Sequence, residues 1–167
     1  MSDLDDLATR VGNALEASGD VLATAESCTG GGIAETVTRR AGSSAWFDRA
    51  YITYSNDAKR EMLGVSAETL KAHGAVSEVV AREMAEGALR GAATVAVAVS
   101  GVAGPGGGTD SKPVGMVCLA WAKAGGEVSA VTRRYRGDRA AVRRQAVIDA
   151  LEGVIARVAP AGKARKT

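Results

Sequence analysis

The chain has 167 residues, a length that suits one domain with a single substantial core. It is 46% hydrophobic and 24% charged, as in soluble globular proteins, and its longest uncharged apolar stretch, residues 92–105, is too short and polar to cross a bilayer. The net charge of +2 argues against a nucleic-acid partner. The acidic opening MSDLDDLATR lacks a basic n-region followed by an apolar run, so no signal peptide is expected. We expect a cytoplasmic protein without a membrane partner.

The hydrophobic pattern predicts helices and strands in alternation. An amphipathic helix over residues 3–18 comes first and ends at Gly19. Its apolar stripe consists of Leu4, Leu7, Val11 and Leu15. The later elements are, in chain order, a strand over 20–25, a helix over 31–40, a strand over 49–55, helices over 57–63, 67–72 and 77–91, strands over 94–101, 114–122 and 127–135, and a helix over 138–158.

This alternation, which ends in a hairpin-like pair of strands, predicts an α/β fold. We expect a three-layer α/β/α sandwich around a mixed, mostly parallel sheet of about five strands. Residues 1–160 should form one domain, because no linker in the sequence is long enough to divide it. The basic residues 161–167 are expected to be a disordered tail.

Three unusual segments follow predicted strands, at residues 27–32, 54–59 and 100–108. Ligands of open α/β sheets gather at the carboxyl ends of the strands, so these segments should converge on one site. Ser100 and Gly101, directly at a strand end, are better placed to touch a ligand than the Gly-rich loop that follows them. That loop, GVAGPGGGTDSKPVG, is not a Walker A sequence; a lid, a ligand cradle and a plain surface loop all remain open for it.

Ser27 precedes a helix N-terminus, where free amides and the helix dipole stabilise negative charge. The amides of Thr29, Gly30 and Gly31 can therefore form an oxyanion hole or hold a phosphate. Alternatively, Ser27 or Thr29 only caps the helix and the glycines permit tight packing. Cys28 is interpreted as a small packed residue rather than a nucleophile, because no histidine lies near it in the sequence.

The base for any hydrolytic chemistry must be found among few candidates. The chain has one histidine, His73, in a turn-like setting, and two cysteines without a zinc-binding spacing, so we expect no metal and no cofactor. Lys59 falls in the first turn of a helix capped by Ser55 or Asn56, where the dipole lowers the pKa of an ammonium group. A lysine there can also be an ordinary surface charge. Ser27 with Lys59 is nevertheless the best nucleophile and base pair available.

The basic residues are concentrated near the end of the chain, where residues 131–167 carry ten Lys or Arg and three acids. Arg139, Arg143 and Arg144 open the last predicted helix. On a helical projection Arg144 falls in the apolar stripe and Arg143 at its edge, which suggests a pocket wall suited to phosphate or carboxylate. The alternative is that these first-turn residues project beyond the core.

Three stretches of the sequence resemble one known family. They are ESCTGGGIAETVTRRAGSSAWFDRAYITYSNDAKREMLGV, GAVSEVVAREMAEGA and AVSGVAGPGGGTDSKPVGMVCLAWA. They are similar to the C-terminal domain of the CinA (competence- and damage-inducible) family, over about residues 4–158. The resemblance implies hydrolysis of the carboxamide of nicotinamide mononucleotide to nicotinate mononucleotide and ammonia, without a metal, in pyridine nucleotide recycling. Larger members carry an N-terminal domain similar to molybdopterin-binding proteins, and no activity of that domain is expected here.

The resemblance also implies roles for individual residues. Ser27 matches the family's nucleophile and Lys59 its base. Tyr54, Ser55 and Asn56 would surround the substrate. At the last helix, Gly137, Asp138 and Arg139 match the family's Gly-Asp-Arg segment, and Arg139 and Arg143, one turn further on, would also bind the substrate. Ser100 stands where many relatives have threonine, which keeps the hydroxyl group.

Other functions remain open from the sequence. A non-catalytic nucleotide-binding or regulatory module would use the same loops, with Lys59 charged and paired with phosphate. Nucleic-acid binding through the Arg-rich last helix is a weaker alternative. We also expect a homodimer or higher homo-oligomer, for which the segment SSAWFDRAY could expose aromatic side chains.

Overall fold

The computed structural model describes residues 2–158. The tail expected at 161–167, and the domain boundary at 160, lie outside this range. The elements are α1 (Asp3–Ser18), β1 (Leu22–Glu26), α2 (Gly32–Val37), η1 (Ser43–Ala45), β2 (Phe47–Ile52), α3 (Asn56–Leu63), α4 (Ala67–His73), α5 (Glu78–Gly87), β3 (Val95–Gly101), β4 (Met116–Lys123), β5 (Val128–Arg134) and α6 (Arg139–Val158). Each predicted helix and strand is present, with ends shifted by a few residues.

The five strands form one mixed sheet in the order β2-β1-β3-β4-β5. β1 pairs in parallel with β2 and β3, whereas β3 with β4 and β4 with β5 are antiparallel. The expected mixed sheet of five strands is therefore confirmed, but "mostly parallel" is too strong. No helix lies between β3 and β4 or between β4 and β5, and without such a crossover consecutive strands return antiparallel.

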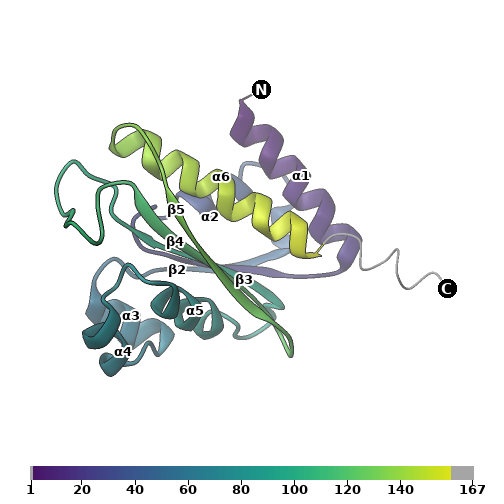
Figure 1. Ribbon diagram of the computed structural model, residues 1–167. Coiled ribbons are helices and arrows are strands. Elements are labelled where there is room, and N and C mark those ends of the chain that lie inside the picture. The colour runs from purple at the N-terminus through teal and green to yellow at the C-terminus, as the bar shows by residue number, and fades with distance from the viewer. Residues whose placement is uncertain (1, 159–167) are drawn as a thin grey trace.

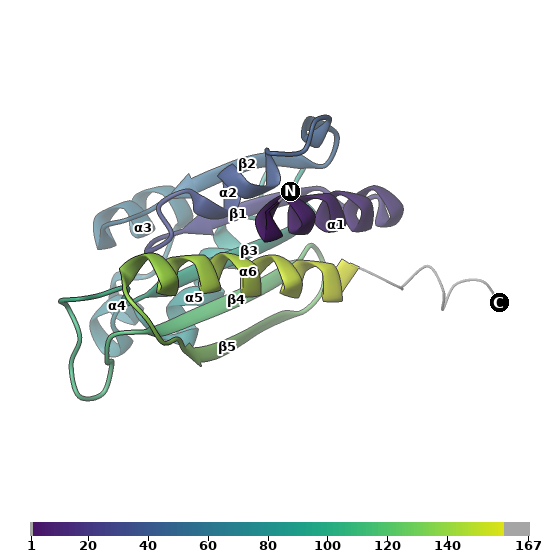
Figure 2. The same ribbon diagram turned by 90° about the horizontal axis from the view of Figure 1, so that it is seen from above.

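Helices cover both faces of the sheet. Figures 1 and 2 show α1, α2 and α6 on one face and α3, α4 and α5 on the other. The two faces carry different side chains, because successive residues of a strand point to opposite sides. In β3, Val95, Val97 and Val99 pack toward α1 and α6, while Ala96 and Ala98 pack toward α5.

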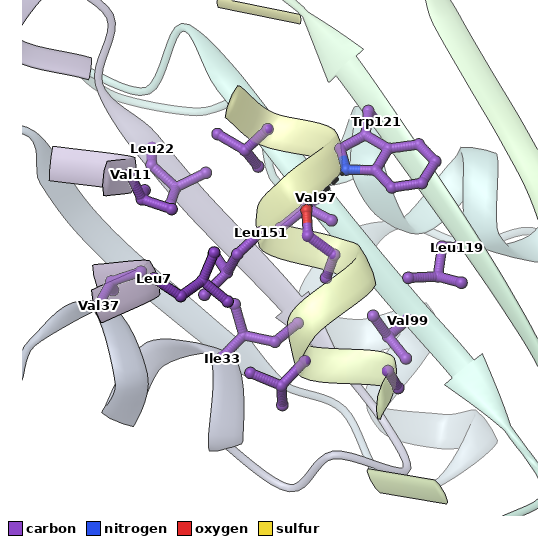
Figure 3. Packing of buried hydrophobic residues seen from close by; sticks show 14 of the residues in the cluster. Leu7, Val11, Leu22, Ile33, Val37, Val97, Val99, Leu119, Trp121 and Leu151 are labelled. Atoms are coloured by element: carbon purple, nitrogen blue, oxygen red, sulfur yellow. Dashed lines mark hydrogen bonds between the residues drawn. The ribbon is translucent and has the colours of Figure 1, made fainter. Parts of the chain in front are cut away.

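The core on the α1 and α6 face is the bulkier of the two. Figure 3 shows Leu7 of α1 directed toward Leu151 of α6, and Val11 of α1 beside Leu22 of β1. It also shows the Trp121 indole of β4 against α6, where its Nε1 donates a hydrogen bond of 2.9 Å to the carbonyl of Ala150. This packing fixes α6 on the sheet and thereby places the arginines at its start.

Two of the three aromatic side chains in the segment SSAWFDRAY, Trp46 and Phe47, pack in or against the core. Trp46 is only 1% exposed and belongs to the core, and Phe47 is half-buried against it. These side chains therefore do not form an exposed aromatic patch, because the turn after η1 directs Trp46 inward, beside β1. None of the helices within residues 2–158 is both long enough and apolar enough to span a membrane.

The parallel strands bring three chain segments to one edge of the sheet. Glu26, the last residue of β1, is in register with Ile52 of β2 and Val99 of β3. Backbone hydrogen bonds continue this pairing past the strand ends, since Ser27 N–H donates to Val99 at 3.0 Å and Thr53 N–H donates to Glu26 at 2.8 Å. The residues that follow these strands are therefore neighbours.

Candidate active site

Ser27 and Lys59 meet at this edge of the sheet. Lys59 Nζ lies 3.1 Å from Ser27 Oγ, and both residues are buried. Ser27 comes directly after β1. Lys59 is held by α3, whose N-cap is Ser55: its side chain accepts a hydrogen bond from the backbone of Ala58.

Lys59 has a second partner that fixes its direction. Its Nζ donates to the backbone carbonyl of Thr53 at 2.9 Å, just beyond the end of β2. Within residues 2–158, no carboxylate forms an ion pair with Lys59. Burial lowers the pKa of Lys59 below its ordinary value of 10.5, with a smaller opposing effect from Cys28. The sequence predicts such a shift from the helix dipole, whereas removal of the amine from water is its largest cause in the structure.

Cys28, next to Ser27, is a packed thiol. Burial raises the pKa of Cys28 to about 11, so the thiol stays protonated near neutral pH. Only a thiolate is an effective nucleophile. Ser27 is therefore the residue of this pair that can react.

Glu26 is a site residue that the sequence reasoning did not identify. Its side chain is fully buried, and Oε1 accepts hydrogen bonds from the Thr29 hydroxyl at 2.6 Å and from the N–H groups of Gly31 at 3.1 Å and Ile33 at 3.0 Å. Oε2 accepts from the N–H of Ala34 at 2.9 Å. The available signal was a lone carboxylate at the end of an apolar strand, directly before a Gly-rich helix start. An anion in that position stabilises the N-terminus of the helix from inside the protein.

The amides of Gly30 and Gly31, which were expected to help bind an oxyanion, already have acceptors in the structure. The N–H of Gly31 is bonded to Glu26, and that of Gly30 donates to Ser27 O at 3.0 Å. These two amides therefore do not offer free donors, and the glycines serve instead as turn residues with φ of 58° and 101°. In the described part of the chain, the N–H groups of Cys28 and Thr29 have no acceptor.

A cavity of about 320 Å³ opens over the Ser27–Lys59 pair. The predicted substrate residues that line it are Tyr54, Asn56, Ser100, Gly101 and Arg139. Other expected substrate residues lie outside its lining: Ser55 caps α3, and Thr29 is bonded to Glu26. The Ser100 hydroxyl donates to the carbonyl of Ala75 at 2.8 Å, which ties the α4–α5 connection to the cavity.

The arginines of α6 have three different environments. Arg139 spans the rim of the cavity, where it donates to Gly104 O at 2.8 Å and to the Tyr54 hydroxyl at 2.9 Å. Arg143 donates to the carbonyls of Cys28 and Thr29. Arg144 is exposed and pairs with Asp3 at 3.5 Å. The pocket-wall role suggested for Arg144 is wrong, because the buried stripe of α6 begins at Val142 and passes to one side of it.

A second cavity, of about 640 Å³, lies beside the first, and Ala103 and Arg139 contribute to both. It also contains Arg143 and the first residues of α6. Within residues 2–158, no three His, Cys, Asp or Glu side chains are grouped as metal ligands.

Residues 4–158 match the family model described as the CinA C-terminal domain. The chain belongs to the CinA C-terminal domain family. Among its CinA relatives, the nicotinamide-nucleotide amidohydrolase PncC of Escherichia coli K12 is 56% identical over 154 residues, which cover 90% of this chain and 92% of that protein. The protein of the same name from Pseudomonas putida is 52% identical over 156 residues, covering 93% and 97%.

Solved structures show the same CinA fold. The crystal structure of the competence/damage inducible protein CihA from Agrobacterium tumefaciens superimposes with a TM-score of 0.90 at 50% identity, covering 93% of this chain and 96% of that one. The resemblance stated from the sequence motifs is therefore confirmed at the level of the family.

Proposed function

We propose that this chain hydrolyses the carboxamide of nicotinamide mononucleotide, releasing nicotinate mononucleotide and ammonia. The observation that carries the proposal is the contact of 3.1 Å between Lys59 Nζ and Ser27 Oγ on the floor of an open cavity. The names of the relatives that are 56% and 52% identical support the choice of substrate. This reaction would give the protein a role in pyridine nucleotide recycling.

The first step would form an acyl-enzyme. A neutral Lys59 can donate one N–H to Thr53 O while its lone pair accepts the Ser27 hydroxyl proton. As that proton moves to Lys59, Ser27 Oγ attacks the carboxamide carbon and the carbonyl oxygen becomes an oxyanion. The N–H groups of Cys28 and Thr29 are the donors nearest in sequence that remain available for it.

The following steps would restore the enzyme. The Lys59 ammonium returns the proton to the amide nitrogen, the carbon–nitrogen bond breaks, and ammonia leaves an ester on Ser27. Water then attacks this ester, with Lys59 again accepting a proton. Cleavage of the ester returns this proton from Lys59 to Ser27 Oγ and releases nicotinate mononucleotide as its carboxylic acid, which loses its proton to the solvent to give the carboxylate.

The phosphate of the substrate would lie near Arg139. This guanidinium stands between the two cavities and holds Tyr54 and Gly104 at the rim. Arginine suits a phosphate because its planar fork can donate two parallel hydrogen bonds. With the nicotinamide ring over Ser27, Tyr54 and Asn56 would face the rest of the nucleotide.

The test is to incubate the protein with nicotinamide mononucleotide and to measure ammonia and nicotinate mononucleotide together. We expect turnover by the unsubstituted protein and by Ser44→Ala, a substitution at an exposed serine. Ser27→Ala should bind the nucleotide without releasing ammonia. If the unsubstituted protein binds the nucleotide but releases no ammonia, the chain is a non-catalytic nucleotide-binding module and the proposal is wrong.

A further inference from the structure

Residues 27–31, here called the nucleophile turn, are held from two sides by buried or half-buried charges. The Glu26 carboxylate accepts hydrogen bonds from two donors of the turn, the Thr29 hydroxyl and the Gly31 N–H. The Arg143 guanidinium donates hydrogen bonds to two carbonyls of the turn: Nε donates to Cys28 O at 3.1 Å and Nη2 donates to Thr29 O at 3.3 Å. The turn therefore lies between an anion and a cation.

Arg143 is directed at this backbone and not at a carboxylate. In the part of the chain that the structure describes, no acidic side chain forms an ion pair with it. It reaches the turn from α6, more than a hundred residues away in the sequence. The turn also leaves room for it at Gly30, where a Cβ would lie 3.4 Å from Arg143 Nη2. Two of its three guanidinium nitrogens are thus used on one tight turn.

Both free amides of the turn are connected to Arg143 through peptide groups. The carbonyl of Cys28 and the N–H of Thr29 belong to one peptide, so the bond from Nε acts directly on the Thr29 donor. The carbonyl of Thr29 shares a peptide with the Gly30 N–H, which donates to Ser27 O at 3.0 Å. The carbonyl of Ser27 in turn shares a peptide with the N–H of Cys28. Two hydrogen-bonded chains therefore run from the guanidinium to the two unpaired donors.

We infer that Arg143 is a positioning residue, which orients and polarises the N–H groups of Cys28 and Thr29 for an oxyanion formed on Ser27. A trans peptide fixes its N–H opposite to its carbonyl, so holding the carbonyls sets the direction of the donors. A cation on a carbonyl oxygen also strengthens the N–H of the same peptide, and hydrogen-bonded chains pass this polarisation on. This role differs from the anion-binding pocket wall that the sequence suggested for Arg143, and it rests on the proposed serine mechanism.

The test measures the reactivity of Ser27 without the nucleotide. A fluorophosphonate probe is attacked by Ser27 Oγ, which forms an oxygen–phosphorus bond as fluoride leaves and Lys59 takes the proton. We expect Arg143→Met to slow this labelling about 10- to 100-fold, less than the roughly 100- to 1,000-fold loss that follows removal of one oxyanion donor, because both donors remain present. Arg144→Met, on the exposed side of the same helix, should label at the unsubstituted rate. Thermal unfolding of both variants checks that they are folded.

A second readout separates positioning from phosphate binding. For Arg143→Met, the turnover number with nicotinamide mononucleotide should fall by the same factor as labelling, while the Kd of nicotinate mononucleotide stays within about threefold, because the donors act on the oxyanion and not on the bound ground state. If Arg143→Met does not fold, Arg143→Lys, which cannot hold both carbonyls, must label more slowly than Arg144→Lys. Labelling at the unsubstituted rate with a weakened Kd would overturn the inference and make Arg143 a phosphate ligand. No labelling of the unsubstituted protein would overturn the proposed function together with this inference.

Discussion

Lys59 Nζ lies 3.1 Å from Ser27 Oγ and 2.9 Å from the carbonyl of Thr53. The lysine is 1% exposed, so its amine is removed from water and anchored to the end of a strand. The carbonyl of Thr53 accepts a hydrogen bond from the Lys59 amine, and the Ser27 hydroxyl lies close enough to transfer its proton to that amine. A base with this arrangement needs no histidine.

Replacement of Lys59 by methionine should abolish most of the activity while preserving the fold. Methionine fills a similar buried volume but cannot accept a proton, and general base catalysis contributes about a thousandfold. Ammonia release from nicotinamide mononucleotide measures the loss. Lys71→Met, at an exposed lysine of α4, should be fully active. A Lys59→Met variant within tenfold of the unsubstituted rate would exclude Lys59 as the base.

The same substitution should change how stability depends on pH. The pKa of Lys59 is lowered in the folded state, so between that pKa and 10.5 the unfolded chain binds the extra proton. The stability of the unsubstituted protein should therefore gain from this group as pH rises through that window, and Lys59→Met should lack the gain. Urea unfolding between pH 7 and 10.5 measures the difference in free energy of unfolding between the two proteins. A difference that is the same at every pH would contradict the lowered pKa.

Glu26→Gln should destabilise the protein by about 3 kcal/mol, because a buried carboxylate with several backbone donors is replaced by a group with only one acceptor atom. The amide nitrogen of the new side chain would face the N–H of Ala34 or of Gly31 and Ile33, donor against donor. Glu35→Gln is the matched control on α2, since Glu35 is exposed and should contribute only about 0.5 kcal/mol through its surface ion pair. Chemical unfolding compares the two. Equal stability of both variants would mean that Glu26 does not hold the helix start.

Gly153→Ala tests the packing of α6 on the sheet. Alanine in a helix is normally about 1 kcal/mol more stable than glycine. Here a Cβ would overlap the Trp121 indole, which is buried and bonded to Ala150 O, so we expect a net loss of about 1–3 kcal/mol. Gly126→Ala, where the nearest atom outside the adjacent residues is 3.7 Å away, should change the free energy of unfolding by less than about 1 kcal/mol. A stabilised Gly153→Ala variant would show that the indole moves aside freely.

Much of the fold was predictable, because the spacing of hydrophobic residues along a helix or strand shows which of its faces is buried. The strand over residues 94–101 is apolar throughout, and the structure buries it between helices on both faces. The antiparallel direction of β4 was harder to predict. A helical crossover would have returned the strand parallel to β3, whereas a Gly-rich loop returns it antiparallel. The hydrophobic pattern of the strand itself is the same in both cases. The side that Trp46 faces could not be predicted for a similar reason: an aromatic residue in a turn carries no periodic signal that separates core packing from an exposed surface.

The candidate site was only partly predictable. Ser27 and Lys59 were selected as candidates because the chain has a single histidine and because both residues follow predicted strands, whose ends explain their approach. Glu26 was missed because a carboxylate in a sequence does not reveal that three backbone amides will surround it. The contact of Arg143 with the nucleophile turn depends on how α6 docks, a long-range relationship that no local pattern contains.

In the proposed mechanism, Lys59 becomes neutral below its ordinary pKa and then accepts the proton of Ser27. The most direct measurement is an NMR titration of the Lys59 side chain in protein carrying ¹³C-labelled lysine, assigned with Lys59→Met and compared with the pH profile of kcat/KM for ammonia release. We predict that Lys59 titrates with a pKa below 10.5, and that kcat/KM rises with pH to a plateau at that same pKa. Titration of Lys59 together with the exposed lysines, while kcat/KM still rises at lower pH, would contradict the claim.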